Sequence, residues 1–440
     1  MRPNLFDYAT SELSQDAFLL WLMEWGKSCY KVEDNALHTI SQRFIRRLLR
    51  KPDDFEITDI QLFKQQKHID VLAIINNQYA IIIEDKTDTH EHDRQISAYT
   101  QEVQKQYPNL SLTCVYYKSG NESKQSIRNM NKAYKENHPD AADILVLSRK
   151  EMVDILTSEE CQNEILLGYL TKLQEIEEAT NSYLTKPVKE WEWRAWQGFF
   201  MMLEEHFKYD LKFGWGSVPQ RDGGFQGCWF CFHTIPNSKE AKLYIQIEGV
   251  PNNIKDTKVC FKICHIPNQP IDACREWSRK VINLAHERGY SQVTKLISRF
   301  KNGEYMTVAG ISGSDFFGEG IVDFDKVTLL LSDYCFIVKK LTMITCEIYE
   351  KPFVVKSLYK EAVCEFMLCF LRKSSSYYCI EHLDRDANIH QDEDGYWIGE
   401  ITGIWDTDKE DREWEWERTM REFRTVWIDG EQADIQYLYL

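Results

Sequence analysis

The chain has 440 residues, 43% of them hydrophobic and 28% charged, with a formal net charge of −16. This length exceeds one ordinary hydrophobic core, so we expect two or three domains. No stretch reaches the roughly 18 uninterrupted apolar residues of a membrane span, and residues 1–16 lack the basic start and apolar centre of a secretion signal. Together with thirteen scattered cysteines, which are typical of reduced thiols, these features predict a cytoplasmic protein without membrane association.

The negative charge is concentrated at the C-terminus. From Glu381 onward the sequence has 18 Asp and Glu against 6 Lys and Arg, a net charge of −12 that leaves only −4 for the first 380 residues. The overall acidity therefore does not exclude nucleic-acid binding by the N-terminal part.

The first 180 residues alternate between helical and strand-like patterns. In chain order we expect helices at 11–28 and 35–51, a strand at 55–63, a β-hairpin at 68–86 with its turn at two asparagines, a helix at 90–106, strands at 111–117 and 143–148 separated by a linker, and a long helix at 149–178. This order predicts an α/β domain whose first strands are antiparallel and whose later strands are parallel.

The character of the sequence changes at residues 181–195, which we interpret as a domain boundary. Consecutive strand patterns follow, and they predict an α+β domain of unknown role over residues 190–340. The last part, residues 341–440, is expected to be helical over 353–373 and then acidic and rich in tryptophan.

The hairpin carries the strongest chemical signal. The apolar run Ile81 to Ile83 is typical of a strand buried on both faces, yet it ends abruptly in Glu84, Asp85 and Lys86. A three-residue turn at 76–78 pairs Asp70 with Glu84, because cross-strand partners point to the same face. Asp70, Glu84 and Lys86 would then converge on one patch, whereas a two-residue turn would shift the register and separate them.

Such a patch favours metal-assisted chemistry. Two adjacent carboxylates repel each other unless something neutralises them, and hard oxygen ligands suit Mg²⁺. A bound ion can clamp a phosphodiester and lower the pKa of its water, while Lys86 can orient the nucleophile or stabilise developing charge.

These residues resemble the core motif of the PD-(D/E)XK nuclease superfamily, with Asp70 as its aspartate and Glu84-Asp85-Lys86 as its E-x-K element. Ile69 stands where the superfamily name has proline. Gln95 and Tyr99 lie on one face of the next helix and resemble the Q-x-x-x-Y element of its exonuclease-like branch. The opening S-E-L-S-Q-D-A-F resembles the N-terminal helix of a bacterial subgroup.

The resemblance covers about residues 5–150 and implies a restriction-endonuclease-like mixed sheet flanked by helices. It implies a phosphodiesterase that acts on DNA with Mg²⁺ or Mn²⁺, plausibly in defence against foreign DNA. Asp70, Glu84 and the backbone carbonyl of Asp85 would hold the metal, aided by Glu12 or, one turn on, by Asp16. Gln95 and Tyr99 would position the lysine or the nucleic-acid strand.

A basic cluster in the second predicted helix is open to two interpretations. Its arginines and lysine can line a nucleic-acid-binding stripe or simply form a solvated helix face; the cluster consists of Arg43, Arg46, Arg47, Arg50 and Lys51.

Two further features of the sequence allow other interpretations. The spacings Cys228-x2-Cys231 and Cys260-x3-Cys264 invite a zinc site, but both pairs sit inside apolar strand patterns without a turn. A different class of function is a binding or regulatory module that keeps the nuclease fold without turnover. The acidic region from Asp384 to Asp434 is expected to dock a protein partner or to act as a DNA mimic. DNA versus RNA, endo- versus exonuclease action and oligomeric state are left open.

Overall fold

A computed structural model describes most of the chain and divides it into two compact units. Unit 1 comprises residues 1–204 and 214–216, and unit 2 comprises residues 205–213 and 217–440. The division into three domains stays a prediction. The described residues are 3–9, 12–64, 69–89, 95–208, 210, 212–220, 223–236, 238, 240–266, 270–300, 302–342, 347–348, 353–360, 362–364, 378–379, 389–401, 404–405, 425–428, 431–434 and 436–439.

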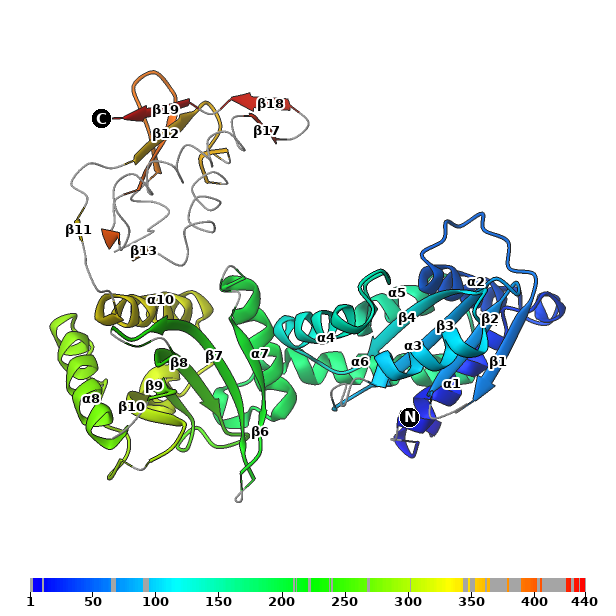
Figure 1. Ribbon diagram of the computed structural model, residues 1–440, viewed down its shortest axis with the longest axis horizontal. Coiled ribbons are helices and arrows are strands. Elements are labelled where there is room, and N and C mark those ends of the chain that lie inside the picture. Colours follow the sequence, from blue (N-terminus) through cyan, green and yellow to red (C-terminus); the bar gives the residue numbers. More distant parts are fainter. Residues whose placement is uncertain are drawn as a thin grey trace. The chain divides into compact units, whose positions relative to one another are not determined.

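Unit 1 is built on a five-stranded mixed sheet in the order β1-β2-β3-β4-β5 (Figure 1). Its strands are β1 (Ile60–Lys64), β2 (Val71–Ile75), β3 (Tyr79–Lys86), β4 (Ser111–Lys118) and β5 (Leu145–Ser148). Its helices are α1 (Glu12–Glu24), α2 (Asn35–Leu49), α3 (Gln95–Gln106), α4 (Lys124–Asn137), α5 (Arg149–Leu156), α6 (Glu164–Asn181) and most of α7 (Trp193–His206), with short 3-10 turns η1 (Leu5–Asp7), η2 (Ser28–Tyr30), η4 (Ser182–Leu184) and η5 (Val188–Glu190).

The strand directions agree with the sequence prediction. β1, β2 and β3 pair antiparallel, whereas β3, β4 and β5 pair parallel. The predicted restriction-endonuclease-like α/β fold is thereby confirmed. Because the parallel strands run the same way, β3, β4 and β5 end at one edge of the sheet, and the residues after Lys86, Lys118 and Ser148 meet there.

Alternating residues of the strands pack into two hydrophobic cores, one on each face of the sheet. Val71, Ala73, Ile81 and Ile83 pack against α1, α2, α5 and α6, whereas Leu72, Ala80 and Ile82 pack against α3 and α4. Each fully buried aliphatic side chain contributes roughly 1.5–3 kcal/mol, so both faces hold β3 in place. This central strand is the one that carries the Glu84-Asp85-Lys86 motif.

The hairpin has the register that the motif requires. Ile75 pairs with Tyr79 and Val71 with Ile83, which continues to Asp70 opposite Glu84. Asn76 and Asn77 make the turn with φ of 53° and 52°, a left-handed conformation that asparagine tolerates better than most residues.

Two local predictions in unit 1 were wrong. The segment between β4 and β5, expected to be a linker, contains helix α4, capped by Ser123; parallel strands need such a crossover. The single helix expected at 149–178 is two helices, because Ser148 forms a capping box with Glu151 and Asn163 caps a second start.

Unit 2 contains the strands β10, β9, β8 and β7, which pair antiparallel in this order and are followed in the same sheet by β6, together with helices α8 and α10 (Figure 1). The three strand patterns predicted here are confirmed as β7, β8 and β9. The elements are β6 (Gly214–Val218), β7 (Phe225–Thr234), β8 (Lys242–Gly249), β9 (Lys258–Cys264), α8 (Pro270–Glu287), β10 (Tyr305–Ser312), α9 (Gly313–Phe317) and α10 (Phe324–Thr342).

The remaining strands of unit 2 are short: β11 (Glu347–Ile348), β12 (Phe353–Ser357), β13 (Tyr378–Cys379), β14 (Ile389–Gln391), β15 (Trp397–Ile401), β16 (Ile404–Trp405), β17 (Thr425–Ile428), β18 (Glu431–Asp434) and β19 (Gln436–Tyr439). The helix expected from residue 353 is wrong at its start, because β12 pairs with β15 and β19 there. Much of the acidic region 384–434 lies outside the described residues, and its role in binding a partner stays a prediction.

Among the described residues, helices that combine the length and the apolar character needed to cross a bilayer are absent.

The edge where the parallel strands end depends on a glycine. A Cβ at Gly120 would lie 1.9 Å from the carbonyl oxygen of Thr87, whereas a Cβ at Gly320 would have nothing within 4 Å. Backbone cannot rotate away as a side chain can, so Gly120→Ala should destabilise unit 1 by about 1–3 kcal/mol. Urea unfolding of both alanine variants checks this; equal stability would contradict the packing described.

Candidate active site

The end of the β2–β3 hairpin brings together the three residues that the motif predicts. Asp70 directly precedes β2 and faces Glu84, and these two carboxyl groups influence each other electrostatically. Lys86, two residues further along β3, approaches Glu84 with Nζ 2.5 Å from Oε1. Glu84 is fully buried and Lys86 nearly so. Asp70, Glu84 and Lys86 therefore form one patch, although the chemical roles given to them stay predictions.

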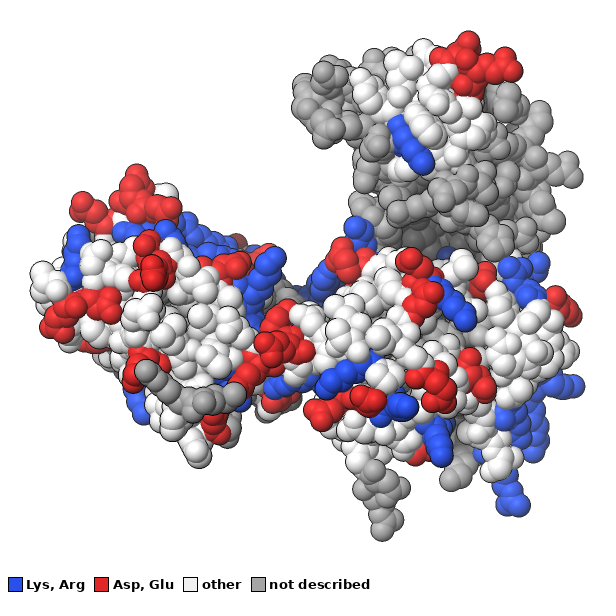
Figure 2. All heavy atoms as spheres, turned by 180° about the vertical axis from the view of Figure 1, so that it is seen from behind, with Lys and Arg blue, Asp and Glu red and all other residues white. Residues whose placement is uncertain are grey.

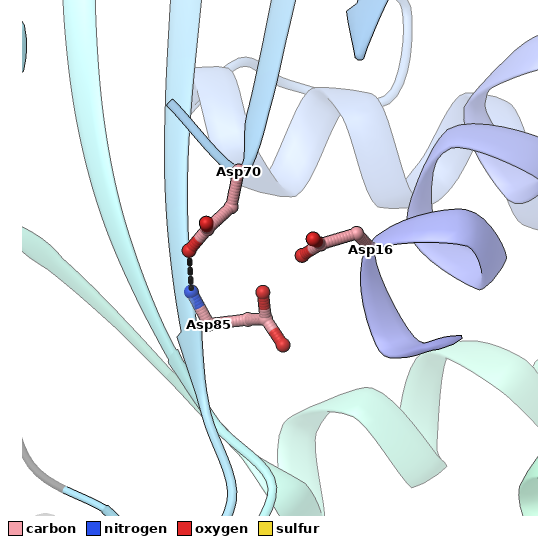
Figure 3. Close-up of side chains that lie close together, drawn as sticks. All are labelled: Asp16, Asp70 and Asp85. Carbon is pink, nitrogen blue, oxygen red and sulfur yellow. Dashed lines mark hydrogen bonds between the residues drawn. The ribbon is translucent and has the colours of Figure 1, made fainter. Parts of the chain in front are cut away.

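A second set of carboxylates meets the same place from the other face of the sheet. One side-chain oxygen each from Asp16, Asp70 and Asp85 lies within 4.8 Å of the other two. Figure 3 shows Asp16 reaching from α1 toward Asp70 and Asp85, which come from the sheet. The backbone N–H of Asp85 donates to Oδ2 of Asp70 at 3.5 Å. Asp70 is thus the residue shared by both groups.

Burial makes the carboxyl groups of Asp70, Glu84 and Asp85 unusually reluctant to ionise. Burial first, and then the charge of Asp70, raise the pKa of Glu84 to about 8. Burial and the neighbouring Asp16 carboxyl raise the pKa of Asp85 to about 10. The pKa of Asp70 is also raised, by burial and by Asp16. Several carboxyls with raised pKa values in one place are typical of sites that bind a cation or do acid–base chemistry.

The residues fit a hard divalent cation. Within the described part of the chain, Oδ1 of Asp16 and Oδ1 of Asp85 are buried without a hydrogen-bond partner. Unsatisfied buried acceptors are costly, and a metal ion would satisfy both. Oxygens that share a Mg²⁺ ion lie roughly 3–4 Å apart, given metal–oxygen distances of about 2.1 Å. Small side-chain rotations would bring Asp16, Asp70 and Asp85 into that range.

Helix α3 supplies the two further residues that the sequence singled out. Nε2 of Gln95 lies 3.4 Å from the hydroxyl of Tyr99, as expected for residues one turn apart. Burial raises the pKa of Tyr99, and Glu84 and Asp70 raise it further through their charges. Tyr99 therefore lies close enough to Asp70 and Glu84 for their charges to affect its pKa. Its role in positioning stays a prediction.

A buried series of hydrogen bonds through Gln15, Tyr169 and Tyr117 holds the Asp85 side chain in place. Nε2 of Gln15 donates to Oδ2 of Asp85 at 2.6 Å, and Oε1 of the same amide accepts from the hydroxyl of Tyr169 at 3.0 Å. Because the Tyr169 hydrogen is used in this way, the adjacent hydroxyl of Tyr117, 2.8 Å away, is the donor to Tyr169. This series of hydrogen bonds fixes which end of the Gln15 amide faces Asp85, so the Asp85 carboxyl accepts a hydrogen bond from Gln15.

The sequence predicts that either Glu12 or Asp16 of the first helix completes the metal site, and the structure describes only one of these two side chains. Glu12 begins α1, but its side chain lies outside the described part. Asp16 is 1% exposed and aims at Asp70 and Asp85. A signal for Asp16 was available in the sequence, because a lone acid on the apolar side of a helix needs a partner. Gln15 and Tyr169 carried no such signal, since 154 residues separate them.

The basic cluster of α2 is largely occupied by contacts within unit 1. Arg46 donates to the carbonyl of Phe55 and Arg50 to that of Asp143; Arg47 pairs with Glu151, Arg43 approaches Glu159 at 4.0 Å, and Lys51 lies over the ring of Tyr79. Tyr79 begins β3, at the opposite end of the strand from Lys86. A nucleic-acid-binding role for the cluster stays a prediction.

The cysteine spacings do not form a metal site in the described part of the chain. There, the cluster of Asp16, Asp70 and Asp85 is the only group of three or more potential ligand residues. Cys228, Cys231, Cys260 and Cys264 are all buried and lie outside any disulfide among the described residues.

Comparison with known families agrees with this geometry. Residues 3–184 match the model of the PD-(D/E)XK nuclease superfamily. The matched segment contains the complete hairpin motif together with Asp16, Asp70, Glu84 and Asp85, so this part of the chain is similar to that superfamily over its whole proposed site. Its members are nucleases that generally use divalent metal ions. No curated protein and no solved structure matches the chain.

The raised pKa values predict how stability depends on pH. A carboxyl whose pKa is higher in the folded than in the unfolded state binds more protons when folded, so stability falls as pH rises between the two values. For Asp85 that window runs from about 4 to about 10. Asp85→Asn keeps an oxygen for Gln15 and removes the charge. The metal-free variant should therefore lose fewer degrees of melting temperature between pH 6 and 8.5 than the wild type, as measured by calorimetry. Parallel curves would contradict the assignment.

The hydrogen-bond chain predicts an effect on metal affinity through a residue that touches no metal. Tyr169→Phe keeps the ring stacked on Phe18, 3.8 Å between centroids, but removes the donor to Gln15. Outer hydrogen bonds of this kind typically contribute 10–100-fold in metal affinity. Calorimetric titration with Mn²⁺ should show about a 10-fold weaker Kd. Tyr134→Phe, which removes a buried hydroxyl near Cys114 and Thr100, is the matched control and should leave Kd unchanged.

Proposed function

We propose that unit 1 is a Mg²⁺-dependent nuclease that hydrolyses phosphodiester bonds in DNA. The observation that carries this proposal is the convergence of Asp16, Asp70 and Asp85 within 4.8 Å, beside the Glu84–Lys86 pair. The similarity of residues 3–184 to a nuclease superfamily supports the type of reaction. The choice of DNA rests on the resemblance.

The residues divide into a metal-holding group and a group that serves the nucleophile. Asp70 and Asp85, with Asp16 from α1, would hold the cation, and Glu84 adds a further carboxylate. A divalent ion bound there supplies Lewis-acid activation of the scissile phosphate and of a water. Lys86 donates hydrogen bonds from Nζ, which can orient the attacking water and stabilise the charge that develops on the phosphate oxygens. The raised pKa of Glu84 suits it to exchange a proton with water near neutral pH.

Gln95 and Tyr99 are proposed to position Lys86 or the nucleic-acid strand. Both lie on α3, whose inner face packs on the sheet face that carries Glu84. The Gln95 amide and the Tyr99 hydroxyl can hold the Lys86 ammonium in one orientation while it forms its ion pair with Glu84.

A second candidate function is a binding module that keeps the fold without turnover. The intact set of Asp70, Glu84 and Lys86 disfavours it, because a module without turnover has no need of a buried lysine beside two carboxyls that burial makes costly. A role in bacterial defence rests on family association alone.

Cleavage assays test the proposal directly. The full chain is incubated with supercoiled plasmid, linear duplex, single-stranded DNA and RNA in Mg²⁺, Mn²⁺ or EDTA. We expect metal-dependent cleavage of DNA that falls at least about 100-fold in Lys86→Ala, since removing one transition-state donor costs about that much. We expect a similar fall in Asp70→Asn, because it removes a carboxylate proposed to hold the metal.

The matched control is Asp53→Asn, an exposed carboxylate near β1, which should keep wild-type activity. Cleavage that survives both site variants would contradict the assignment. If the wild type cleaves nothing, calorimetric titration of wild type and Asp70→Asn with Mn²⁺ separates an intact metal site awaiting an activator from the binding module.

A further inference from the structure

A pocket of about 320 Å³ opens in unit 1 beside the carboxylate patch. Its lining includes Thr87 and Ser119, the residues that follow β3 and β4, together with residues of α6 and of the start of α7. Its inner wall includes Gln15 and Tyr169, whose hydrogen bonds lead to Asp85. A molecule in this pocket therefore lies one side chain away from the proposed metal ligands.

The pocket contains two cationic side chains, Arg194 and Lys172. Nη2 of Arg194 binds the Asp88 carboxylate at 2.9 and 3.3 Å. Nη1 of the same guanidinium is buried and has no hydrogen-bond partner within the described part of the chain. A buried donor without an acceptor is rare in folded proteins, and this nitrogen is able to take an acceptor that the described residues do not supply.

The acidic partners of these cations are weak competitors for such a ligand. The Asp88 side chain is 68% exposed, and the side chain of Glu175, which lies 3.0 Å from Lys172, is 47% exposed. Exposed ion pairs of this kind contribute little and exchange easily. The hydroxyls of Thr87 and Ser119 lie 2.9 Å apart, so one of them keeps a hydrogen to donate. The donor set of guanidinium, ammonium and hydroxyl suits a phosphate group.

On the face drawn in Figure 2, basic and acidic side chains are interspersed. On a mixed surface of this kind, individual, well-placed cations can position a nucleic-acid strand without a broad positive field.

We propose that this pocket binds a backbone phosphate of the substrate strand next to the scissile one, with Arg194 as its principal contact and Lys172 as its second. This inference rests on the nuclease function proposed above and names the group that the enzyme holds beside the reacting bond. Arg194 lies beyond residues 3–184 that match the superfamily, so α7 adds a phosphate contact that the matched segment lacks.

Oligonucleotide binding tests the pocket separately from catalysis. A fluorescent single-stranded DNA 12-mer is titrated in Mg²⁺ with the full chain carrying Lys86→Ala, which prevents turnover, over a series of salt concentrations. Adding Arg194→Ala should weaken binding about 10-fold at low salt and reduce the slope of log K against log salt by about 0.7, the value for one lost phosphate contact on a single strand.

Two further variants sharpen the test. Asp88→Asn removes the competing carboxylate and should tighten binding, an effect that a misfolded protein cannot produce. Lys189→Ala removes an exposed cation just before α7 that does not line the pocket, and it should leave affinity and salt slope unchanged. Comparing a 12-mer that has a 5′-phosphate with one that lacks it shows whether the pocket binds an internal or a terminal phosphate. If it binds a terminal phosphate, the effect of Arg194→Ala will depend on the 5′-phosphate; if it binds an internal one, the effect will be the same for both oligonucleotides.

The outcomes separate this inference from the proposed function. Equal affinity and salt slope for Arg194→Ala and Lys189→Ala would overturn the pocket, as would a wild-type chain that binds no oligonucleotide. On the otherwise wild-type chain, Arg194→Ala should raise KM for cleavage with kcat changed less than about 3-fold. Cleavage that persists without Asp70 or Lys86 would refute the catalytic assignment while leaving the binding result to stand.

Discussion

The gathering of four carboxyl groups at one end of a sheet, three of them buried and Asp70 half-buried, is the constraint on which unit 1 depends. Asp16, Asp70, Glu84 and Asp85 are held together where water is largely excluded. Two like charges 4 Å apart repel by about 4 kcal/mol at an effective dielectric constant of 20. The raised pKa values of Glu84 and Asp85 express this cost. Such an arrangement persists because the two hydrophobic cores on either side of β3 hold its strand in place.

The alternation of a β-strand explains why three consecutive polar residues serve one site. Glu84 and Lys86 point to the face covered by α3, and Asp85 points to the face covered by α1 and α6. Asp70 lies at the start of the neighbouring strand and contacts both groups. Lys86 and Tyr99 thus lie on one face of the sheet, near Glu84, while Asp16, Gln15 and Tyr169 lie on the other, near Asp85.

The parts of this site that lie close in sequence could be predicted, and the rest could not. The spacing of Asp70, Asn76 and Glu84 determines the hairpin register, and the apolar run of β3 indicates its burial. Helix α4 was missed because its sequence is mostly polar and only Tyr134 among its residues is fully buried. The Tyr169–Gln15 contact and the partners of the α2 arginines depend on tertiary packing. Local patterns do not encode such contacts.

Unit 2, which includes the acidic region, lies outside the matched superfamily segment, so its contribution to substrate choice is a separate question. The central claim concerns the metal. Crystals soaked in Mn²⁺ and measured at the manganese absorption edge test it most directly. The account predicts an anomalous peak about 2.1–2.2 Å from carboxylate oxygens of Asp70 and Asp85, with Asp16 in or next to the coordination sphere. Ordered Asp16, Asp70 and Asp85 side chains without a peak between them, at a Mn²⁺ concentration that supports cleavage, would contradict it.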